Sequence, residues 1–273
     1  MINYNGKLLN SGTLTITLQN RALKYGDAVF ETLKVYRGSI VFAEDHYFRL
    51  MASMRMLRMK IPMAFTLEFF ESQILELAVA NKLENARISF TVFRKDGGGY
   101  IPDYQEIEFI VEATNWNQEA KQEYGIDLYK DHFVNSDLLS AVKSNNRLIN
   151  VLAGIYAREN GLDNCVLLNE KKAVVAALDS NIFLISGKLI RTPALSEGCI
   201  RGVVRKKLIE LLQKSPEYEI QETEISVFEM QKADEVFLTN SMTDLQPVTS
   251  YRKKSYQTKQ GLALKAQLLS LYG

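Results

Sequence analysis

The stretch AVKSNNRLIN, residues 141–150, places Lys143 between an extended segment that ends in apolar residues and a polar turn. An apolar run typical of a helix, residues 151–157, follows directly. The neighbours of Lys143 are small or carry side-chain amides, so the backbone can come close to a ligand. An amine that is held in a cleft and partly removed from water can form a Schiff base with a carbonyl group. The stretch alone is also compatible with a solvated lysine at a strand-to-helix turn.

Length and composition limit the classes of protein that remain. The 273 residues suit two domains or one large α/β unit. The net charge of +1 gives no support for nucleic-acid or membrane partners, and no apolar run approaches a membrane span. The N-terminus lacks the basic and apolar regions of a signal peptide. The two cysteines are far apart and there are two histidines, so we expect no disulfide framework, no zinc site of the usual kind and a cytoplasmic location.

Hydrophobic periodicity predicts an α+β first half, in which two helices cover a mostly antiparallel sheet. Asn5-Gly6 is typical of a hairpin turn between two short strands. The helices are expected at residues 44–59 and 66–77, and residues 20–27 are expected to form a loop. The expected strands are residues 14–18, 28–36, 40–42, 87–94 and 106–111, with three glycines, 97–99, in the loop before the last one.

The composition turns polar at Thr114, which predicts a domain boundary. The first domain would span residues 1–113, the linker 114–122 and the second domain 123–273. The second domain would be α/β and would carry Lys143. Its expected helices are residues 146–159, a helix that follows residues 201–204, and residues 258–271; its expected strands are 125–129, 164–168, 173–177, 182–185, 189–191 and 236–238.

Three separate places in the sequence could supply a phosphate site. A phosphate is bound by N–H groups at a helix start, by hydroxyls and by an arginine, and residues 202–204, Ser241 and Arg49 could provide them. Lys143 could provide an amine for an aldehyde on the same ligand. A phosphorylated aldehyde cofactor with these needs is pyridoxal phosphate. Each piece alone also has a structural explanation, since helix arginines are often solvated and turns often contain glycine and serine.

The order of these motifs resembles the class IV, fold type IV pyridoxal-phosphate enzymes, which include branched-chain aminotransferases, D-amino acid aminotransferases and aminodeoxychorismate lyases. The likeness covers nearly the whole chain. Residues 20–32 resemble the opening signature of arginine, glycine-aspartate and phenylalanine-glutamate, and residues 46–50 resemble the histidine-x-x-arginine-leucine helix. Residues 143–148 are similar to the Schiff-base lysine segment, and residues 239–248 to the last active-site strand. The central signature is matched by residues 180–183, 192–193 and 198–205.

The resemblance implies a two-domain α/β fold, with the cofactor in the cleft between the domains, and a homodimer. It implies that Lys143 is the imine lysine and the general base, which moves a proton between the substrate α-carbon and the cofactor. Arg49 would bind the cofactor phosphate. The further cofactor-binding residues would be Val203, Val204, Asn240 and Ser241, with backbone N–H groups donating at the two valines. The candidates for substrate binding are Tyr25, Phe30 and Arg94.

Two departures from the family pattern concern the cofactor. The family's asparagine-glutamate-x-glycine-x-valine-x-glutamate appears as residues 169–176, where Lys172 replaces the glycine and Ala176 the last glutamate. In the family that glutamate keeps the pyridine ring protonated as an electron sink. Asp179 would face the opposite side of a strand and cannot replace it. Val204 stands where many relatives have a threonine, so one hydroxyl donor is lost, and we expect weaker cofactor binding or slower deprotonation.

Three functions remain open within the resemblance. The favoured one is an aminodeoxychorismate lyase-like reaction, in which an external aldimine eliminates pyruvate and gives 4-aminobenzoate; Asn240 and the loss of the glutamate at Ala176 favour it. The second is a class IV aminotransferase for branched-chain or D-amino acids, because residues 30–36 also resemble D-amino acid aminotransferase. The third is a non-catalytic relative that keeps the fold and binds a ligand or partner.

Overall fold

The computed structural model describes residues 1–117 and 120–272. These residues form two compact units. The first contains residues 1–117 together with 143–146, and the second contains the described parts of 118–142 and 147–273. Within the described residues, no helix combines the length and the apolar character that a bilayer crossing requires.

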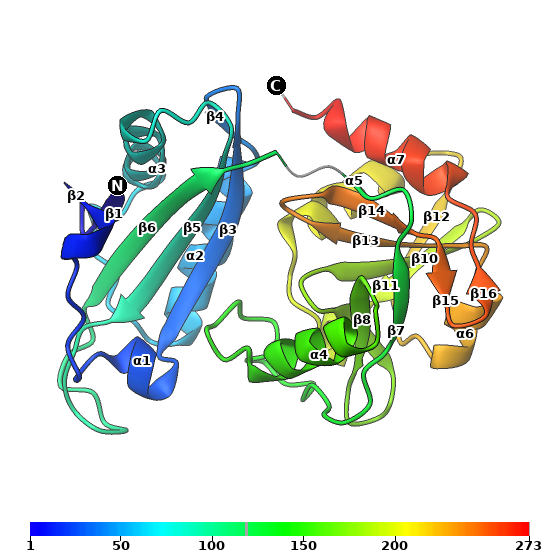
Figure 1. Ribbon diagram of the computed structural model, residues 1–273, viewed down its shortest axis with the longest axis horizontal. Helices are drawn as coiled ribbons and strands as arrows, with labels where there is room; N and C mark the ends of the chain where they lie inside the picture. Colours follow the sequence, from blue (N-terminus) through cyan, green and yellow to red (C-terminus); the bar gives the residue numbers. More distant parts are fainter. Residues whose placement is uncertain (118–119, 273) are drawn as a thin grey trace. The chain divides into compact units, whose positions relative to one another are not determined.

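The first unit is built on a six-stranded sheet in the order β2-β1-β6-β5-β3-β4, in which every neighbouring pair is antiparallel (Figure 1). Helix α2 packs on β3 and helix α3 on β6. The predicted arrangement of two helices on an antiparallel sheet is therefore confirmed. The strands are β1 (Ile2–Tyr4), β2 (Lys7–Leu9), β3 (Ala28–Tyr36), β4 (Ser39–Ile40), β5 (Ala86–Arg94) and β6 (Ile107–Asn115). The helices are α1 (Arg21–Tyr25), α2 (Ala43–Met56) and α3 (Leu67–Ala80), with a 3-10 turn at Ser11–Thr13.

Aromatic rings fill the space between the two helices and the sheet. Phe70 of α3 lies 4.9 Å from Phe90 of β5, and Phe90 lies 5.2 Å from Phe109 of β6, measured between ring centroids. All three side chains are buried. Burying an aromatic side chain stabilises a fold by about 2–3 kcal/mol, and paired rings add to this. This core therefore holds the helices firmly against the sheet.

Two predictions for the first unit are wrong. Residues 14–18 form no strand: their apolar side chains Ile16 and Leu18 are exposed, so the alternation does not mark a buried face. Residues 20–27 are not only a loop, because they contain helix α1. Asn20 begins this helix by accepting a hydrogen bond from Leu23 N (3.0 Å), and Gly26 ends it in the left-handed region at φ +63°.

The predicted linker, residues 114–122, is partly ordered into the first unit. Strand β6 continues through Asn115, and Trp116 N donates to Asn85 O at 3.2 Å. Gln118 and Glu119 of the predicted linker lie outside the described residues. The boundary drawn from composition therefore stays a prediction.

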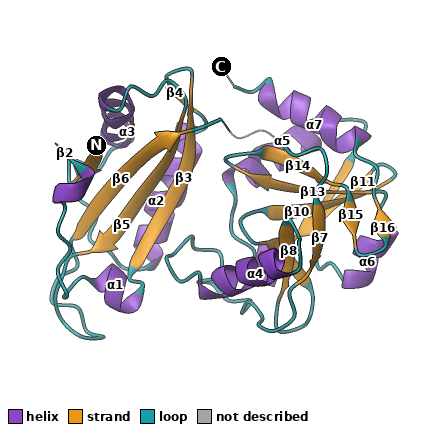
Figure 2. Cartoon of the chain, viewed as in Figure 1, coloured by secondary structure: helices purple, strands orange, loops and turns teal. Residues whose placement is uncertain are grey.

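The second unit contains two five-stranded sheets, in the orders β12-β11-β10-β13-β14 and β16-β15-β7-β8-β9 (Figure 2). The pairs β7–β8 and β11–β12 are parallel, and each is connected through a helix. The strands are β7 (Gly125–Leu128), β8 (Asn164–Leu168), β9 (Val174–Ala177), β10 (Asn181–Ser186), β11 (Leu189–Pro193), β12 (Glu219–Thr223), β13 (Glu235–Asn240), β14 (Asp244–Val248), β15 (Ser250–Tyr251) and β16 (Lys254–Ser255). The helices are α4 (Leu148–Glu159), α5 (Val203–Gln213), α6 (Val227–Lys232) and α7 (Lys259–Leu269).

Strand β14 is a buried element that the sequence pattern did not predict; α6 and β15, each with a buried side chain, were not predicted either. All five of its residues are buried, although Asp244, Gln246 and Pro247 are poor strand formers. Pro247 is tolerated because β14 is the last strand of its sheet. The buried amide of Gln246 is satisfied by Lys121, whose backbone N–H donates to it (2.8 Å) and whose carbonyl accepts from it (2.9 Å).

The segment Lys143–Asn146 pairs with the first unit, although the residues on either side belong to the second. Phe30 N donates to Lys143 O (2.9 Å), and Asn145 N donates to Ala28 O (3.0 Å). Val29 and Ser144 form an antiparallel bridge between these bonds. The position of the lysine backbone is thus set by strand β3.

Candidate functional site

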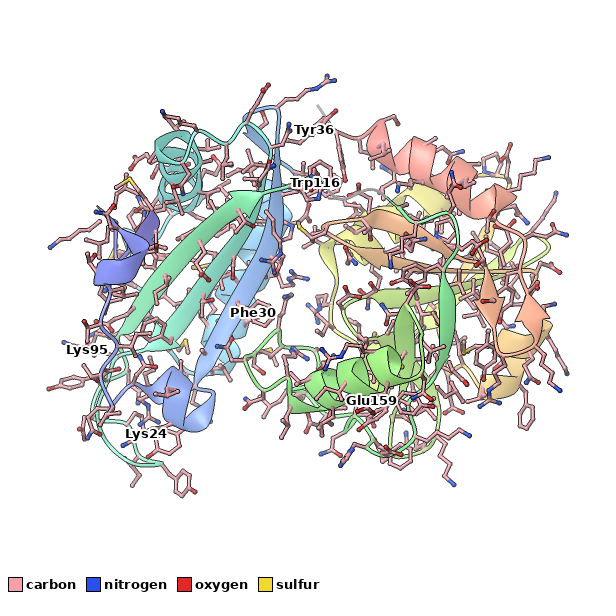
Figure 3. The ribbon with its side chains drawn as sticks, viewed as in Figure 1. Lys24, Phe30, Tyr36, Lys95, Trp116 and Glu159 are labelled. Atoms are coloured by element: carbon pink, nitrogen blue, oxygen red, sulfur yellow. The ribbon has the colours of Figure 1, made fainter. Side chains whose placement is uncertain are left out.

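The amine of Lys143 lies over one face of strand β3. Lys143 Nζ donates to Thr32 Oγ1 at 3.3 Å and lies 3.3 Å from the centre of the Phe30 ring. Phe30, which Figure 3 labels on β3, and Thr32 are two residues apart, so their side chains leave the strand on the same side. Lys143 is half-buried. The amine is therefore held by an aromatic face and a hydroxyl rather than extending freely into water.

The side chain between them, Glu31, leaves β3 on the opposite side and forms a buried ionic cluster with helix α2. Arg49 Nε donates to Glu31 Oε1 at 2.7 Å, and Arg49 Nη2 donates to Glu31 Oε2. His46 Nδ1 lies 2.7 Å from the same Oε2. The side chains of Glu31, His46 and Arg49 are 1%, 2% and 9% exposed. The Arg49 guanidinium thus forms two hydrogen bonds with the Glu31 carboxylate, and both groups are shielded from water.

The cluster has a defined charge near neutral pH. Burial alone would raise the pKa of Glu31, but the charge and hydrogen bonds of Arg49 outweigh it and lower that pKa to about 2. Burial lowers the pKa of His46, against the nearby Glu31 carboxylate, which raises it. The positive charge of Lys143 also contributes to lowering the pKa of His46. Glu31 is therefore ionised and His46 neutral at pH 7.

Glu31 is a residue that sequence reasoning missed as part of the site, and His46 was interpreted as a helix-start residue. A signal was present: His46 and Arg49 are three residues apart and so lie on one face of a helix, which predicts a shared partner. Nothing local identified Glu31 as that partner, because it lies 15 residues from His46 in the sequence. Arg49 is held in place by Glu31.

In the second unit, helix α5 begins without a side-chain cap. Gly202 is its N-cap residue and makes no capping hydrogen bond, so the N–H groups of Val203 and Val204 have no side-chain acceptor there. Both valines are buried. A side chain at position 202 would collide with Asn181 Oδ1, and Asn181 itself donates to Ile200 O at 2.9 Å. A larger residue at position 202 would therefore displace the Asn181 side chain, and the helix start keeps donors that suit an anion.

Asn240 shapes the loop that contains Ser241. Its Oδ1 accepts from Met242 N (2.8 Å) and Thr243 N (2.9 Å), and its Nδ2 donates to Ser180 Oγ (2.9 Å). These bonds fix residues 240–243 as a tight turn at the end of β13. Asn240 thus orients the backbone that presents Ser241.

Ala176 is half-buried on β9 and pairs with Leu167 of β8. The nearest acidic residue along the chain, Asp179, accepts from Asn164 Nδ2 (3.1 Å) and from Ser180 Oγ (2.9 Å). Asp179 is therefore part of a hydrogen-bond network that joins β8 to the turn before β10.

Arg94, a candidate for binding substrate, is 6% exposed and has several partners inside the first unit. Its Nε donates to Asp27 Oδ2 (2.9 Å), and its Nη2 donates to Leu57 O (2.6 Å). Arg21 also donates to Asp27 Oδ2 (2.8 Å) and holds the glycine loop through Gly99 O (2.7 Å). The two arginines therefore fasten the loop after β5 to the sheet.

Tyr25, the other candidate beside Phe30, lies close to that loop. Its ring centroid is 5.6 Å from that of Tyr100, and the guanidinium carbon of Arg21 is 5.0 Å from the Tyr25 ring centre. Tyr25 ends helix α1, so it is placed next to the glycine loop rather than on β3. Of the three candidates, Phe30 is the one in contact with the Lys143 amine.

The donor groups suit two parts of pyridoxal phosphate. Lys143 offers an amine for an aldehyde, and Arg49 offers a guanidinium for a phosphate, both in the first unit. The uncapped start of α5 offers backbone N–H groups for an anion in the second. The sequence pattern predicted Ala176 next to the ring nitrogen, and a methyl group can neither donate nor accept a proton. The residues fit the aldehyde and the phosphate, but position 176 adds nothing for the ring nitrogen.

Known proteins with similar sequences and structures belong to one family, although their names give different activities. Residues 28–251 match the model of the family described as amino-transferase class IV. A putative branched-chain-amino-acid aminotransferase of Methanocaldococcus jannaschii is 30% identical over 263 residues, which cover 95% of this chain and 90% of the relative. An aminodeoxychorismate lyase of Vibrio harveyi is 29% identical over 243 residues, 86% of each chain. The solved structure of a branched-chain amino acid aminotransferase of T.th. with pyridoxamine 5′-phosphate has a TM-score of 0.88 at 23% identity, covering 98% of this chain and 92% of that one.

Proposed function

The chain belongs to the class IV aminotransferase family and is a pyridoxal-phosphate-dependent enzyme of fold type IV, and from this premise we propose that it is an aminodeoxychorismate lyase-like enzyme. The reaction would release pyruvate and give 4-aminobenzoate. The observation that carries the proposal is the contact between Lys143 Nζ and Thr32 Oγ1 at 3.3 Å. An elimination removes a proton from one atom and delivers a proton to the leaving group, and an amine beside a hydroxyl provides a group for each transfer.

Pyridoxal phosphate, when bound, supplies an aldehyde that condenses with an amine and a ring that withdraws electrons from the adjacent carbon. Lys143 would take the proton from the substrate carbon that carries the amino group. Thr32 would donate its hydroxyl proton to the departing enolpyruvyl oxygen and regain it from Lys143. The Phe30 ring would keep water away from the amine, which stays poised for proton transfer.

We propose that both units supply donors for the cofactor phosphate. In the first unit Arg49 would bind the phosphate, oriented by Glu31. In the second unit the donors would be the N–H groups of Val203 and Val204 and the hydroxyl of Ser241, whose loop is shaped by Asn240. For the substrate, the contact with the amine supports Phe30, while Tyr25 and Arg94 would act through the glycine loop.

The alternative within the family is a class IV aminotransferase for branched-chain or D-amino acids. Its support is the relative from M. jannaschii, which carries the name of a putative branched-chain-amino-acid aminotransferase. A non-catalytic relative is a third possibility, for which the replacement of an acidic residue by Ala176 is the reason. Transamination places the greater demand on a protonated ring, because the ring must hold the electron pair of the substrate carbon until a proton reaches the cofactor carbon, whereas an elimination passes the pair on to the leaving group; a residue without a carboxylate at position 176 would therefore favour the lyase.

We further propose that the enzyme is a homodimer. The first unit exposes Leu18 (82%), Tyr100 (93%) and Ile101 (85%), and the second exposes Leu148 and Val151 on helix α4. Leu148 and Val151 are three residues apart on one face of α4, and an exposed apolar face is typical of a surface that a partner covers. Sedimentation velocity of the purified protein would give a dimer mass if this is right and a monomer mass if it is wrong.

One assay separates the reactions. Purified protein with added pyridoxal phosphate would be supplied with aminodeoxychorismate, or with D- and L-amino acids and a keto-acid acceptor, while pyruvate and amino products are measured. Release of pyruvate from aminodeoxychorismate without an acceptor supports the lyase. Product that forms only with an acceptor establishes the aminotransferase and overturns the lyase.

Covalent attachment tests the role of the lysine independently of turnover. After borohydride reduction of the protein with cofactor, mass spectrometry should find the pyridoxyl group on Lys143. No attachment in the wild type, together with no turnover of any substrate, would favour the non-catalytic relative.

A further inference from the structure

Helix α2 presents two different faces. His46 and Arg49 point to strand β3, where both contact Glu31. Tyr47, Met51 and Arg55 follow one another at four-residue spacing and line a pocket on a different side of the helix. The pocket shares its helix with the ionic cluster but includes none of the residues around Lys143.

The pocket is formed within the first unit. Its second wall is the segment that leaves α2 and enters α3, which contributes Met59, Ile61, Pro62, Met63, Phe65 and Thr66. The volume is about 440 Å³. Pockets that bind small molecules occupy about 300–1,000 Å³, so the size admits a small organic ligand.

Most of the lining residues are apolar, but polar and apolar atoms share the exposed surface of the pocket almost equally. Three thioethers contribute to it, from Met51, Met59 and Met63. Methionine side chains adjust to ligands of different shape because they are unbranched and polarisable. The polar atoms already have partners: Tyr47 Oη donates to Phe65 O (2.8 Å), and Thr66 Oγ1 accepts from Phe69 N (3.2 Å). The methionine side chains and the charged Arg55 are therefore the groups that a ligand would contact, which suits a molecule with both an apolar part and a charged part.

One charge in the lining remains for a ligand. Arg55 is exposed, and no ion pair joins it to the described chain. No aspartate or glutamate lines the pocket. Arg58 adds a second positive charge nearby, whereas Lys60 is paired with Glu106 at 2.8 Å. The electrostatic potential at this site favours an anion.

We propose that this pocket binds an amphipathic carboxylate, meaning a small molecule with an apolar body and one carboxylate group. The apolar body contacts the thioethers of Met51, Met59 and Met63. The carboxylate pairs with the guanidinium of Arg55, in the bidentate geometry that these groups prefer. This pocket includes none of the residues proposed for catalysis, so the binding proposal and the proposed function are tested independently.

The cluster of methionines provides a local reporter. Protein labelled with [methyl-¹³C]methionine would be titrated, as the holoenzyme, with 4-phenylbutyrate and with its neutral analogue 4-phenylbutanol, and the methyl resonances followed by NMR. We expect 4-phenylbutyrate to shift the methyl signals of Met51, Met59 and Met63. Met230 and Met242, in the second unit, should not move. The alcohol should bind at least twofold more weakly, since it lacks the charge.

Three variants test the contacts. Arg55→Gln should weaken binding of 4-phenylbutyrate about two- to fivefold, because an exposed ion pair is lost. Arg58→Gln, a matched loss of an exposed cation outside the lining, should weaken binding less than Arg55→Gln does. Met51→Trp should fill the pocket and abolish the shifts at Met59 and Met63. Circular dichroism would verify that each variant is folded.

Several outcomes overturn the proposal. Equal affinity for the acid and the alcohol would show that Arg55 does not bind the carboxylate. Equal effects of the Arg55 and Arg58 variants would also show that Arg55 makes no specific contact with it. Absence of shifts at Met51, Met59 and Met63 up to millimolar probe would show that the pocket does not bind this class of ligand. Shifts that depend on protein concentration and do not respond to the probe would identify a second copy of the chain as the occupant instead.

Discussion

Replacing Glu31 by glutamine removes the charge at the centre of the buried ionic cluster. Glutamine keeps the size of the side chain and can still donate or accept hydrogen bonds. The guanidinium of Arg49, with its side chain 9% exposed, would then lack the carboxylate that it contacts through Nε and Nη2. Burying a cation without its counter-charge is the main cost of this change.

The size of the effect follows from the lowered pKa of Glu31 and from the general cost of breaking a buried ion pair. The pKa of Glu31 is about 2, against an ordinary value of 4.5, which is a difference of 2.5. At about 1.4 kcal/mol for each pKa unit, the folded state stabilises the ionised carboxylate by roughly 3 kcal/mol. Breaking a buried ion pair by removing one partner costs about 3–5 kcal/mol. We therefore expect Glu31→Gln to lower the free energy of unfolding of the first unit by about 3 kcal/mol.

The protein has a natural reporter for this unit. Trp116 is the single tryptophan, and it packs against Lys34 (4.3 Å from Nζ to the ring centre) and Tyr36 (6.2 Å between ring centroids), both on β3. Figure 3 labels Tyr36 and Trp116. Urea unfolding followed by tryptophan fluorescence therefore reports on the sheet that carries Glu31.

A matched control uses an exposed pair of the same chemistry. Lys60 Nζ and Glu106 Oε1 are 2.8 Å apart, but their side chains are 70% and 47% exposed. Glu106→Gln should therefore change the unfolding free energy by less than about 1 kcal/mol. If Glu31→Gln had no larger effect than Glu106→Gln, with the same slope against urea, the argument from burial would be refuted.

The dependence of stability on acidic pH tests the contribution of Glu31 independently. Because the folded-state pKa of Glu31 is lowered, its stabilisation is fully present above about pH 4.5 and is lost as the pH falls toward 2. The pKa of His46 is lowered as well, since its burial opposes the charged form, and its share is present above pH 6.5 and lost below it. The advantage of the wild type over Glu31→Gln should thus shrink between pH 4.5 and 2; an advantage that grows there would contradict the assignment.

Three further predictions concern other parts of the chain. Thr32→Val should lower pyruvate release about 100-fold with cofactor affinity unchanged, whereas Thr91→Val, on the neighbouring strand β5, should not; equal rates in the two variants would remove the proposed proton donor. Gly202→Ala should lower the melting temperature because the new methyl group meets Asn181, and a second change, Asn181→Ala, should recover part of the loss; no recovery would refute the contact. Arg94→Met should destabilise the first unit by about 3 kcal/mol in the same urea assay, and a change below about 1 kcal/mol would mean that its buried ion pair is weak.

Local patterns in the sequence predicted those elements whose signal is contained in a few residues. The hairpin at Asn5-Gly6, the strand at residues 28–36 and the helices near 44–59 and 66–77 are confirmed, with ends shifted by a few residues. Each depends on turn chemistry or on hydrophobic spacing, which act over one element at a time. Strand β14 was missed because its burial depends on Lys121, more than a hundred residues away, and its own residues suggest a loop.

The candidate site was predictable only as a set of separate pieces. A lysine after an extended segment and an arginine three residues after a histidine could be recognised from spacing. The sequence could not show that Glu31 joins His46 to Arg49, because a strand and a helix meet there through tertiary packing. It also could not show that the Asn240 side chain accepts hydrogen bonds from backbone N–H groups of its own loop, because the same amide could equally bind a ligand.

Pairing register relates the two groups of the site to each other. Along β3, Phe30 and Thr32 face the Lys143 amine, while Glu31, between them, faces α2 and holds Arg49. The bridge between Val29 and Ser144 fixes this arrangement. Because successive strand residues alternate sides, a shift of one residue in β3 would turn the Glu31 carboxylate toward the amine and leave the guanidinium without its partner. An amine paired with a carboxylate is held protonated and cannot attack a carbonyl, so the same strand register separates the nucleophile from the anion that positions the arginine.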